Sequence, residues 1–147
     1  MRILVLSDNH YKEISPDLKY DYIIHCGDHG SYLDVLNTLN AHYVKGNCDF
    51  SGPKELIIDI NNKKIYITHG DMYNVKMSYN SICYKALSVN ADICMFGHTH
   101  NQKAFYVENI LFLNPGSYMN GDYIEIIDED ILFYKDNILV DKLVFRW

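Results

Sequence analysis

The chain has 147 residues and a net charge of −6 at neutral pH, and 48% of its residues are hydrophobic. The length suits one domain with a sizeable core, and the composition argues against disorder. An acidic balance offers no general attraction for nucleic acid or anionic membranes, and no apolar run approaches the ~20 residues that span a bilayer. We therefore expect a single domain over residues 1–147 with neither a membrane nor a long nucleic acid as partner.

The cysteines indicate the compartment. They show no C-x-x-C pairing, and only four apolar residues separate Met1-Arg2 from Ser7-Asp8, too few for a secretion signal. We therefore expect a cytoplasmic protein with reduced thiols. Cys26, Cys83 and Cys94 are interpreted as plain buried side chains, since free cysteine is among the most buried residue types.

The N-terminal part alternates apolar runs with polar loops. Residues 2–7 and 22–26 have the pattern of buried strands, residues 31–40 place leucines at helical spacing, and residues 42–45 form a short strand pattern. This alternation predicts a parallel α/β sheet whose functional loops follow the strands' C-terminal ends.

The rest of the chain is richer in strand patterns. Asn61-Asn62 and Glu108-Asn109 separate pairs of β-rich runs and predict two hairpins. The other expected elements are a helix over 74–90 and strands over 55–60, 63–68, 92–96, 104–107, 110–113, 123–127, 131–134 and 138–145. Two packed sheets with helices outside account for this pattern.

Residues that bind divalent metals well lie in five short clusters, each at or just after an apolar run. They are Asp8 and His10 in S-D-N-H, Asp28 in G-D, Asn47 in G-N-C-D, His69 in T-H-G-D, and His98 and His100 in G-H-T-H. If the backbone stays extended past the strand, side chains two residues apart point the same way. Carboxylate, imidazole and amide groups suit Mn²⁺, Fe²⁺, Zn²⁺, Co²⁺ or Ni²⁺ without a thiolate. The repetition at strand ends predicts a site for two metal ions.

The order D-x-H, G-D, G-N-x-D, H-G and G-H-T-H resembles the calcineurin-like metallophosphoesterase superfamily. The small size, the variant over residues 46–49 and the Asn114-Pro115-Gly116-Ser117 segment resemble its small YfcE-type phosphodiesterase branch most. The resemblance covers essentially the whole chain. It implies an α/β fold, an αββα four-layer sandwich of two packed mixed β-sheets flanked by helices. At one edge of the sheets it implies a centre of two divalent ions, with Mn²⁺ the first choice and Ni²⁺, Co²⁺, Zn²⁺ or Fe²⁺ as alternatives.

The resemblance also assigns the ligands to two ions joined by one bridging carboxylate. It implies Asp8, His10 and His100 for the first ion, Asn47, His69 and His98 for the second, and Asp28 for both. Asp8, Asp28, Asn47 and His98 would act in catalysis as well. The implied reaction is hydrolysis of a small phosphate ester by in-line attack of a hydroxide that bridges the ions.

One position departs from the pattern of many relatives. They carry a histidine after the asparagine, which protonates the leaving group, and here the residue is Cys48. A thiol with a pKa near 8.5 is a poor acid in that role, and this favours diesters or activated esters. We expect Asp49 to orient a ligand histidine. His29 is interpreted either as an exposed loop residue or as an alternative proton donor.

Other polar residues have weaker assignments. His25 and His42 are interpreted as structural, and Asp71 and Asn114 as residues that line the pocket. The Asn114-Pro115-Gly116-Ser117 segment is equally typical of a tight turn that closes a hairpin.

The segment between His10 and Asp28 is shorter than the family pattern. Ser15-Pro16 opens only Asp17–Tyr20, so the first helix is nearly absent and would leave one face of the first sheet uncovered. We therefore expect a homodimer or larger oligomer.

Three functions remain open from the sequence. A phosphodiesterase is the first, a phosphomonoesterase the second, and a non-catalytic interaction scaffold like the retromer subunit of the same fold the third. The scaffold departs from G-H-T-H, whereas this chain keeps all the ligand positions, which favours an enzyme.

Overall fold

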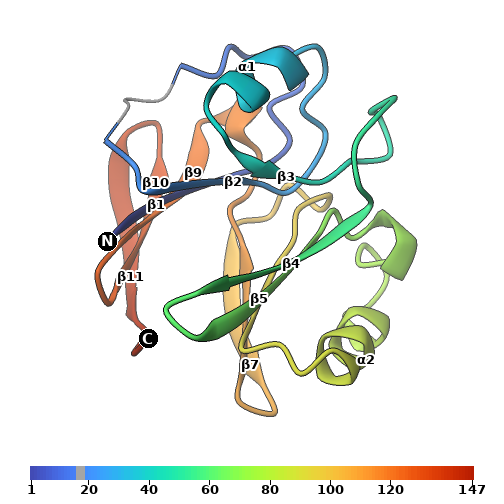
Figure 1. The fold of residues 1–147 in the computed structure, drawn as a ribbon, viewed down its shortest axis with the longest axis vertical. Coiled ribbons are helices and arrows are strands. Elements are labelled where there is room, and N and C mark those ends of the chain that lie inside the picture. Colours follow the sequence, from blue (N-terminus) through green and yellow to red (C-terminus); the bar gives the residue numbers. More distant parts are fainter. Residues whose placement is uncertain (16–18) are drawn as a thin grey trace.

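The computed structural model describes residues 1–15 and 19–147. One six-stranded sheet has the order β11-β10-β9-β1-β2-β3 (Figure 1). Strands β1, β2 and β3 are parallel to one another, while β9 to β11 form an antiparallel extension. The strands are β1 (Arg2–Leu6), β2 (Tyr22–His25), β3 (His42–Tyr43), β9 (Asp122–Ile127), β10 (Asp130–Lys135) and β11 (Ile138–Val144).

The second sheet has five strands in the order β4-β5-β6-β8-β7. Its central strands β5, β6 and β8 are parallel, and β4 and β7 are antiparallel edges. The strands are β4 (Glu55–Ile60), β5 (Lys63–Thr68), β6 (Ile93–Met95), β7 (Lys103–Val107) and β8 (Ile110–Asn114). The helices are α1 (Leu33–Thr38), α2 (Asn80–Ser88) and the 3₁₀ turns η1 (Asp71–Tyr73) and η2 (Tyr118–Asn120).

The alternation of side chains along β5 explains the layers. Ile65 and Ile67 face the first sheet in the main core, whereas Tyr66 faces outward and packs with Ile82 and Ala86 of α2. On the far side of the first sheet, Leu36 of α1 joins a third apolar cluster. The sandwich predicted from the sequence is confirmed, with one short α-helix outside each sheet.

Both predicted hairpins are present. Asn61 and Asn62 have φ of 51° and 62°, and Glu108 and Asn109 have φ of 50° and 65°, the left-handed values of a two-residue hairpin turn. The helix predicted from residue 74 is wrong in its start, because α2 begins at Asn80.

Left-handed residues on either side of η1 explain why the helix starts later than predicted. Gly70 and Asn74, with φ of 109° and 52°, bracket η1 and keep the chain out of a continuous helix. Val75 is still buried against the second sheet, so its apolar character reflects packing rather than helical periodicity. The segment from Asn114 to Ser117 leads from β8 to η2 and closes no hairpin.

The outer face of the first sheet is better covered than we expected. The short first helix expected after Ser15-Pro16 falls partly on residues 16–18, which lie outside the described residues. Among those described, Leu4, Leu6 and Ile14 are at most 5% exposed, and rings such as Tyr20 and Tyr118 pack beside them. The reason for expecting an oligomer is therefore not supported, and the oligomeric state stays a prediction for light scattering to test.

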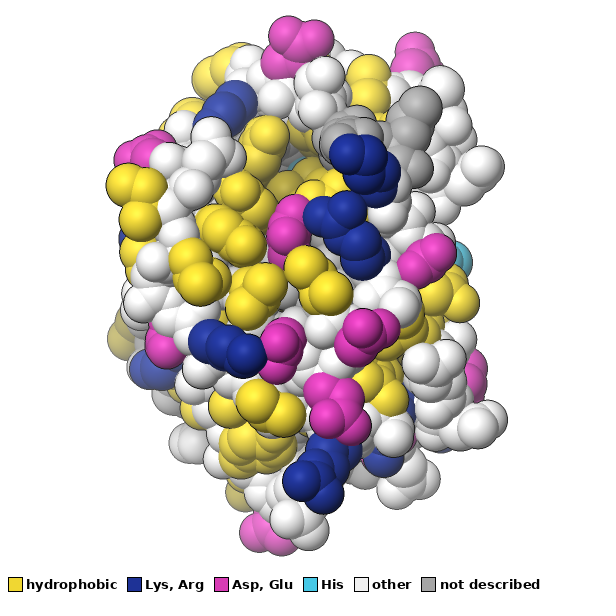
Figure 2. Space-filling model, turned by 90° about the vertical axis from the view of Figure 1, so that its left-hand side faces the viewer, with side chains coloured by type: hydrophobic (Ala, Val, Ile, Leu, Met, Phe, Trp, Pro, Cys, Tyr) yellow, Lys and Arg dark blue, Asp and Glu magenta, His cyan; other side chains and the backbone are white. Residues whose placement is uncertain are grey.

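Exposed apolar side chains lie instead on the edge strand β11, where Ile138, Leu139, Val140 and Val144 are about half exposed or more. Figure 2 shows this side of the molecule, with apolar side chains spread among charged ones. Among the described residues, no helix combines the length and apolarity needed to cross a membrane.

Candidate metal centre

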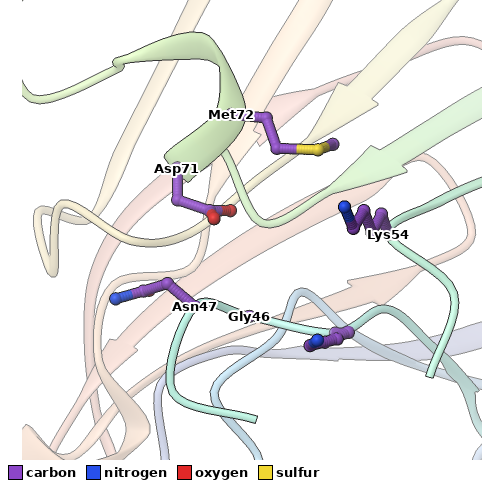
Figure 3. Close-up of a pocket in the computed structure, with 6 residues that line it drawn as sticks. Gly46, Asn47, Lys54, Asp71 and Met72 are labelled. Carbon is purple, nitrogen blue, oxygen red and sulfur yellow. The ribbon is translucent and has the colours of Figure 1, made fainter. Parts of the chain in front are cut away.

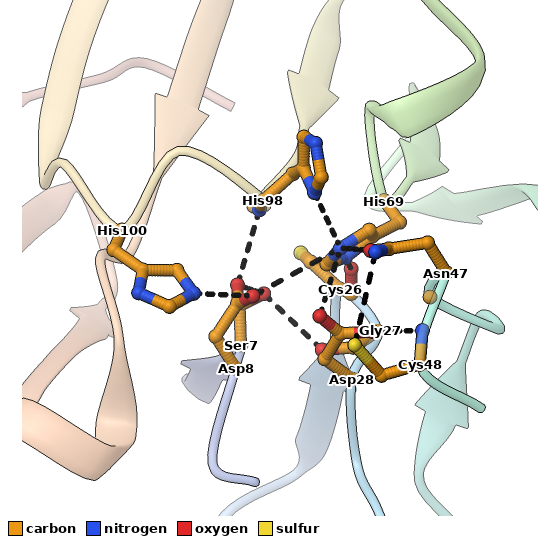
Figure 4. Close-up of polar contacts among 12 residues, drawn as sticks. Ser7, Asp8, Cys26, Gly27, Asp28, Asn47, Cys48, His69, His98 and His100 are labelled. Carbon is orange, nitrogen blue, oxygen red and sulfur yellow. Dashed lines mark hydrogen bonds and ion pairs between the residues drawn. The ribbon is translucent and has the colours of Figure 1, made fainter. Parts of the chain in front are cut away.

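The ligand candidates all follow parallel strands, and the C-terminal ends of these strands meet at one edge of the sandwich (Figure 4). Asp8 and His10 follow β1, Asp28 follows β2, and Asn47 follows β3. In the second sheet His69 follows β5, and His98 and His100 follow β6. The structure therefore brings together the side chains that the five sequence clusters predicted.

The backbone that carries these side chains is not extended, contrary to our expectation for the two i, i+2 pairs. Asp8, His10, Asp28, His98 and His100 have positive φ between 47° and 70°. Aspartate and histidine tolerate this left-handed region better than most residues, and such conformations concentrate at functional sites. The site is thus built from sharp turns directly after the strands.

Two glycines permit the close packing of these turns. A Cβ added at Gly46 would lie 2.0 Å from Oδ1 of Asp28, and one added at Gly97 would lie 2.0 Å from Oγ of Ser7. Any larger residue at either position would push a ligand loop away. These glycines therefore serve the close approach of neighbouring loops.

One group of ligand atoms surrounds Asp8. Its Oδ1 lies 3.1 Å from Nε2 of His100, 3.9 Å from Nε2 of His10 and 3.9 Å from Nε2 of His69. Nε2 of His10 and Nε2 of His100 are 3.4 Å apart. Despite these neighbours, Oδ1 is buried and accepts no hydrogen bond from the described residues.

The second group centres on His69. Its Nε2 lies 3.1 Å from Oδ1 of Asn47 and 3.2 Å from Nδ1 of His98. Oδ2 of Asp28 is 3.3 Å from this Nε2 and 4.0 Å from Nε2 of His10. The Asp28 carboxylate therefore lies between the two groups, where a bridging ligand is expected.

Hydrogen bonds fix which atoms face the centre. Nδ1 of His69 is 2.7 Å from the carbonyl oxygen of Cys26, so this nitrogen is assigned the proton and Nε2 is left with its lone pair. Oδ1 of Asp28 accepts a hydrogen bond from the Cys48 N–H at 2.9 Å, which leaves Oδ2 facing the imidazoles. Oδ2 of Asp8 accepts from Oγ of Ser7 and from the His98 N–H.

The pKa shifts follow from this crowding. Burial raises the pKa of Asp8. Burial alone would lower the pKa of His69, but the carboxylates of Asp28 and Asp8 outweigh it and raise that pKa. Burial and the neighbouring His69 lower the pKa of His98. Carboxylates and imidazoles therefore converge closely enough to shift one another's pKa values.

These observations fit a divalent metal centre. Asp8, His10 and His100 present ligand atoms within 4.8 Å of one another, and so do Asp8, Asp28 and His69. A buried carboxylate oxygen with imidazole lone pairs around it and no hydrogen-bond donor is a costly arrangement that a metal ion would satisfy. Carboxylate, imidazole and amide together suit borderline divalent ions.

Asp49 does not orient a ligand histidine. It is buried, and its carboxylate accepts hydrogen bonds from backbone N–H groups of Asp28, Gly30 and Gly46 at 2.8 to 3.0 Å. It also lies 3.3 Å from Nε2 of His29. Its role is to hold the turn that carries Asp28 against the turn that carries Asn47.

His29 is buried, contrary to its interpretation as an exposed loop residue, at only 2% exposure. Its ring packs edge-on against His25 and Tyr43, beneath the loop rather than in the centre. The structure therefore gives it no access to a leaving group.

His25 and His42 have the structural positions expected for them. The ring of His25 is fully buried and its Nε2 lies 2.9 Å from Oδ1 of Asn9, while Nδ1 accepts the Gly27 N–H. Burial, with a contribution from His29, lowers the pKa of His25 to about 3. His42 stacks on Tyr22.

Asn114 does not line a pocket. It is buried and donates hydrogen bonds to the Gly97 carbonyl and to Oγ1 of Thr99, which holds the loop between His98 and His100. Asp71, in contrast, lines a pocket of about 260 Å³ beside Asn47, together with Lys45, Gly46, Lys54 and Met72. Figure 3 shows Asp71 and Lys54 on opposite sides of this pocket.

The two lysines are site residues that sequence reasoning missed. Lys45 directly precedes the Gly46-Asn47 cluster, and this adjacency was a usable signal. Lys54 follows Pro53, whose carbonyl accepts a hydrogen bond from the Lys45 N–H at 2.6 Å. No pattern in the sequence indicates that contact.

Comparisons with known proteins agree with the fold. The calcineurin-like phosphoesterase superfamily domain matches residues 1–123. The chain therefore belongs to the calcineurin-like phosphoesterase superfamily, a family of metal-dependent hydrolases of phosphate esters.

Two relatives show which proteins the chain is similar to in sequence. The chain is 34% identical over 128 residues to the probable metallophosphoesterase YsnB of Bacillus subtilis, covering 80% of this chain and 75% of that protein. It is 30% identical over 172 residues to a protein of Methanocaldococcus jannaschii that is named a phosphodiesterase, covering 95% and 99%.

Solved structures show the same fold. Escherichia coli Yfce, a phosphoesterase, has a TM-score of 0.67 at 17% identity and covers 98% of this chain and 99% of its own. Entamoeba histolytica Vps29 complexed with Zn²⁺ has a TM-score of 0.79 at 23% identity, with the same coverage. The resemblance inferred from the sequence is confirmed.

Proposed function

We propose that this protein is a phosphodiesterase that binds two divalent metal ions and hydrolyses a small phosphate ester. The observation that carries the proposal is the position of Asp28 between two sets of ligand atoms, around Asp8 and around His69. Asp8, His10 and His100 would hold one ion, Asn47, His69 and His98 the other, and Asp28 would contact both.

When bound, two divalent ions lower the pKa of a water molecule toward neutrality and neutralise phosphate oxygens. The protein's own part is orientation and charge. Asp28 keeps Oδ2 toward the centre because the Cys48 N–H occupies Oδ1. In the neutral ring of His69 the proton lies on Nδ1, which bonds to the Cys26 carbonyl, so Nε2 would be free to hold an ion. Asn47 is exposed and His98 is half-buried, so both would be accessible to a phosphate ester.

The proposed substrate is a diester or an ester with a good leaving group, because the site lacks an obvious acid. Cys48 is exposed next to the centre, and partial desolvation together with the Asp28 carboxylate raises the pKa of its thiol. His29 is buried away from the centre. Lys45 and Lys54 would add positive charge beside Asn47, where the acidic chain otherwise relies on metal ions.

Mn²⁺, the first choice that the family resemblance implies, is the proposed resident ion, and a set of two carboxylates, four imidazoles and one amide suits it along with Fe²⁺, Zn²⁺, Co²⁺ and Ni²⁺. The Cys48 sulfur complicates the choice, because it lies within 4.8 Å of ligand atoms of His10 and Asp28. A soft thiolate would favour Zn²⁺. The proposed compartment is the cytoplasm, in keeping with four unpaired cysteines.

The alternative is a non-catalytic scaffold, since Vps29 proteins share the fold. An Entamoeba Vps29 structure contains Zn²⁺, so metal binding alone does not separate an enzyme from a scaffold. Turnover does. The retained set of ligand atoms and the lysines beside Asn47 favour an enzyme.

The deciding experiment is a panel of phosphodiesters and phosphomonoesters incubated with purified protein and Mn²⁺, Ni²⁺, Co²⁺, Zn²⁺ or Mg²⁺. We expect bis(4-nitrophenyl) phosphate to be hydrolysed faster than 4-nitrophenyl phosphate. Asp28→Ala should lose both turnover and bound metal. Absence of turnover with every ion, together with unchanged metal content in Asp28→Ala, would overturn the proposal. Faster monoester hydrolysis would instead support a phosphomonoesterase.

A further inference from the structure

Two aromatic side chains next to the candidate metal centre are fully exposed to solvent. Tyr11 is 93% exposed and Phe50 is 102% exposed relative to an extended reference chain. Both line one pocket of about 290 Å³, together with His10, Gly30, Ser31 and Cys48. The pocket therefore adjoins the centre on the side of His10 and Cys48, and the lysine-lined pocket lies beside Asn47.

The backbone under each ring is held firmly. Tyr11 follows His10, whose N–H donates to the Asp28 carbonyl at 3.2 Å, and the Tyr11 carbonyl accepts a hydrogen bond from the Tyr32 hydroxyl. Phe50 follows Asp49, which is buried and bonded to several backbone N–H groups. Exposure of these rings is thus a feature of anchored turns.

The rings contribute nothing to the core. Neither belongs to the three apolar clusters that pack between and outside the sheets. Large aromatic side chains usually bury much of their area, and exposed ones beside polar ligands mark recognition surfaces. Aromatic faces stack on planar groups whatever their substituents.

We infer that Tyr11 and Phe50 form a subsite for a planar aromatic group joined to the phosphate of the substrate. This inference rests on the proposed phosphoesterase function and deepens it. A volume of 290 Å³ is near the lower limit of small-molecule sites, about 300 Å³, and suits one ring system rather than a polymer. The net charge of −6 also opposes a long polynucleotide. A nucleobase and an aryl group share the required chemistry.

Binding of two phosphonates that differ only in the aromatic group tests the subsite. Phenylphosphonate and methylphosphonate are titrated calorimetrically into Mn²⁺-loaded protein. Phe50→Ala and Tyr11→Ala should each weaken phenylphosphonate binding about tenfold, within the roughly 5- to 150-fold range that stacking supplies, and leave methylphosphonate unchanged. Phe50→Tyr and Tyr11→Phe keep the stacking face and should bind like the parent protein.

Tyr84→Ala is the matched control, because Tyr84 is also exposed, at 74%, but lies on α2. It should change neither affinity. Circular dichroism confirms that each variant is folded. Equal losses for both phosphonates, or no loss for either, would overturn the subsite.

A kinetic arm separates the two sources of the aromatic group. The alanine variants are compared with the parent protein on a 2′,3′-cyclic nucleotide, on bis(4-nitrophenyl) phosphate and on an aliphatic diester. A selective loss on the cyclic nucleotide points to a nucleobase, and a selective loss on the aryl ester points to an aryl group. Hydrolysis that is equally affected for all three esters contradicts the subsite alone. Phosphonate discrimination without hydrolysis of any ester contradicts the proposed reaction and leaves the subsite standing.

Discussion

The buried carboxylate of Asp49 accepts a hydrogen bond from the backbone N–H of Asp28 at 2.8 Å. The same oxygen accepts the Gly46 N–H at 2.8 Å, and the other oxygen accepts the Gly30 N–H at 3.0 Å. One acidic side chain therefore fastens together the turns after β2 and β3. Asp49 thus holds Asp28, the candidate bridging ligand, in position without itself facing the centre.

Asp49→Asn should destabilise the protein by about 2–4 kcal/mol, because the new amide NH₂ must face N–H donors. The midpoint of urea unfolding measures the loss. Asp141→Asn is the control, since Asp141 is exposed on β11 and should shift stability by less than about 0.5 kcal/mol. Equal midpoints for Asp49→Asn and the parent protein would show that the two turns are held together by other contacts.

His25 should make the protein sensitive to acid. Its folded pKa of about 3 lies below the unfolded value of 6.5, so the unfolded chain binds the extra proton between these values. Stability from this group is present above pH 6.5 and is lost as the pH falls toward 3, by roughly 1.4 kcal/mol per pH unit. The main cause is burial of the ring, and both ring nitrogens already have partners in the neutral form.

Unfolding free energies of His25→Gln and the parent protein at several pH values between 7 and 4 test this. The variant starts less stable, but its stability should fall less steeply as the pH drops. His42→Gln, on the partly exposed β3, should keep the parent's slope. Parallel curves for His25→Gln and the parent protein would assign the acid sensitivity to other groups.

Asp8→Asn should separate metal binding from folding. An amide NH₂ in place of Oδ1 can donate toward the surrounding imidazole nitrogens, so the metal-free variant should be at least as stable as the metal-free parent. The parent should gain about 2.7 kcal/mol at a free Mn²⁺ concentration 100 times its Kd, and EDTA should remove this gain.

Thermal melts with Mn²⁺ and with EDTA measure the stability gained from the metal. Elemental analysis of dialysed protein measures the number of bound ions. The variant should show a smaller melting shift and fewer than two bound ions. If it retains two Mn²⁺ ions per chain, Asp8 is not a ligand.

The sequence predicted which side chains meet, but not how the backbone brings them together. Motif order and strand ends placed Asp8 and Asp28 at the same edge, because parallel strands end together. The left-handed φ of both residues is a tertiary outcome, since the turn must fit against neighbouring loops. No periodic pattern of residues in the sequence indicates this left-handed conformation.

Two interpretations from the sequence, the exposure of His29 and the start of the second helix, are wrong. His29 follows a ligand and was expected in a loop, yet the loop folds its ring inward against Tyr43. The predicted helix over 74–90 placed Val75 on the same apolar face as Ile82, yet the left-handed Asn74 delays α2 until Asn80. For His29 the contact with Tyr43, distant in the sequence, decides the burial of the ring, and a single sequence does not show such contacts.

Lys45 and Lys54 should contribute to substrate affinity rather than to the chemical step. Both line the pocket beside Asn47 and could pair with a phosphate oxygen or a second anionic group. Each alanine substitution should raise KM about twofold to fivefold with kcat nearly unchanged, the size expected for a solvent-exposed ion pair. The dependence of KM on salt should also weaken.

Steady-state kinetics at two ionic strengths measures both effects. Lys142→Ala is the control, because Lys142 pairs with Asp130 at 2.8 Å on the β10–β11 hairpin, and it should leave KM unchanged. A fall in kcat with constant KM would instead place the lysines in the chemical step.

Cys48→His should widen the range of leaving groups. Position 48 lies directly after Asn47, its N–H is fixed by Asp28, and its side chain is exposed beside His10. The thiol is a poor acid, and burial and Asp28 raise its pKa further. An imidazole at this position titrates near neutrality, and a positioned acid typically contributes 10²- to 10⁴-fold, so a gain of roughly tenfold is a modest expectation for an engineered one.

The gain should appear only with poor leaving groups. We expect kcat to rise for an alkyl phosphate ester and to change little for a 4-nitrophenyl ester, whose leaving group needs no proton. Cys48→Ser is the matched control, because it keeps the size of the side chain without supplying an acid. An equal rise for both esters would mean that the histidine acts on metal occupancy, and measuring bound Mn²⁺ in each variant separates these causes. A leaving-group-selective rise would show that the residue at position 48 limits this site to diesters and activated esters.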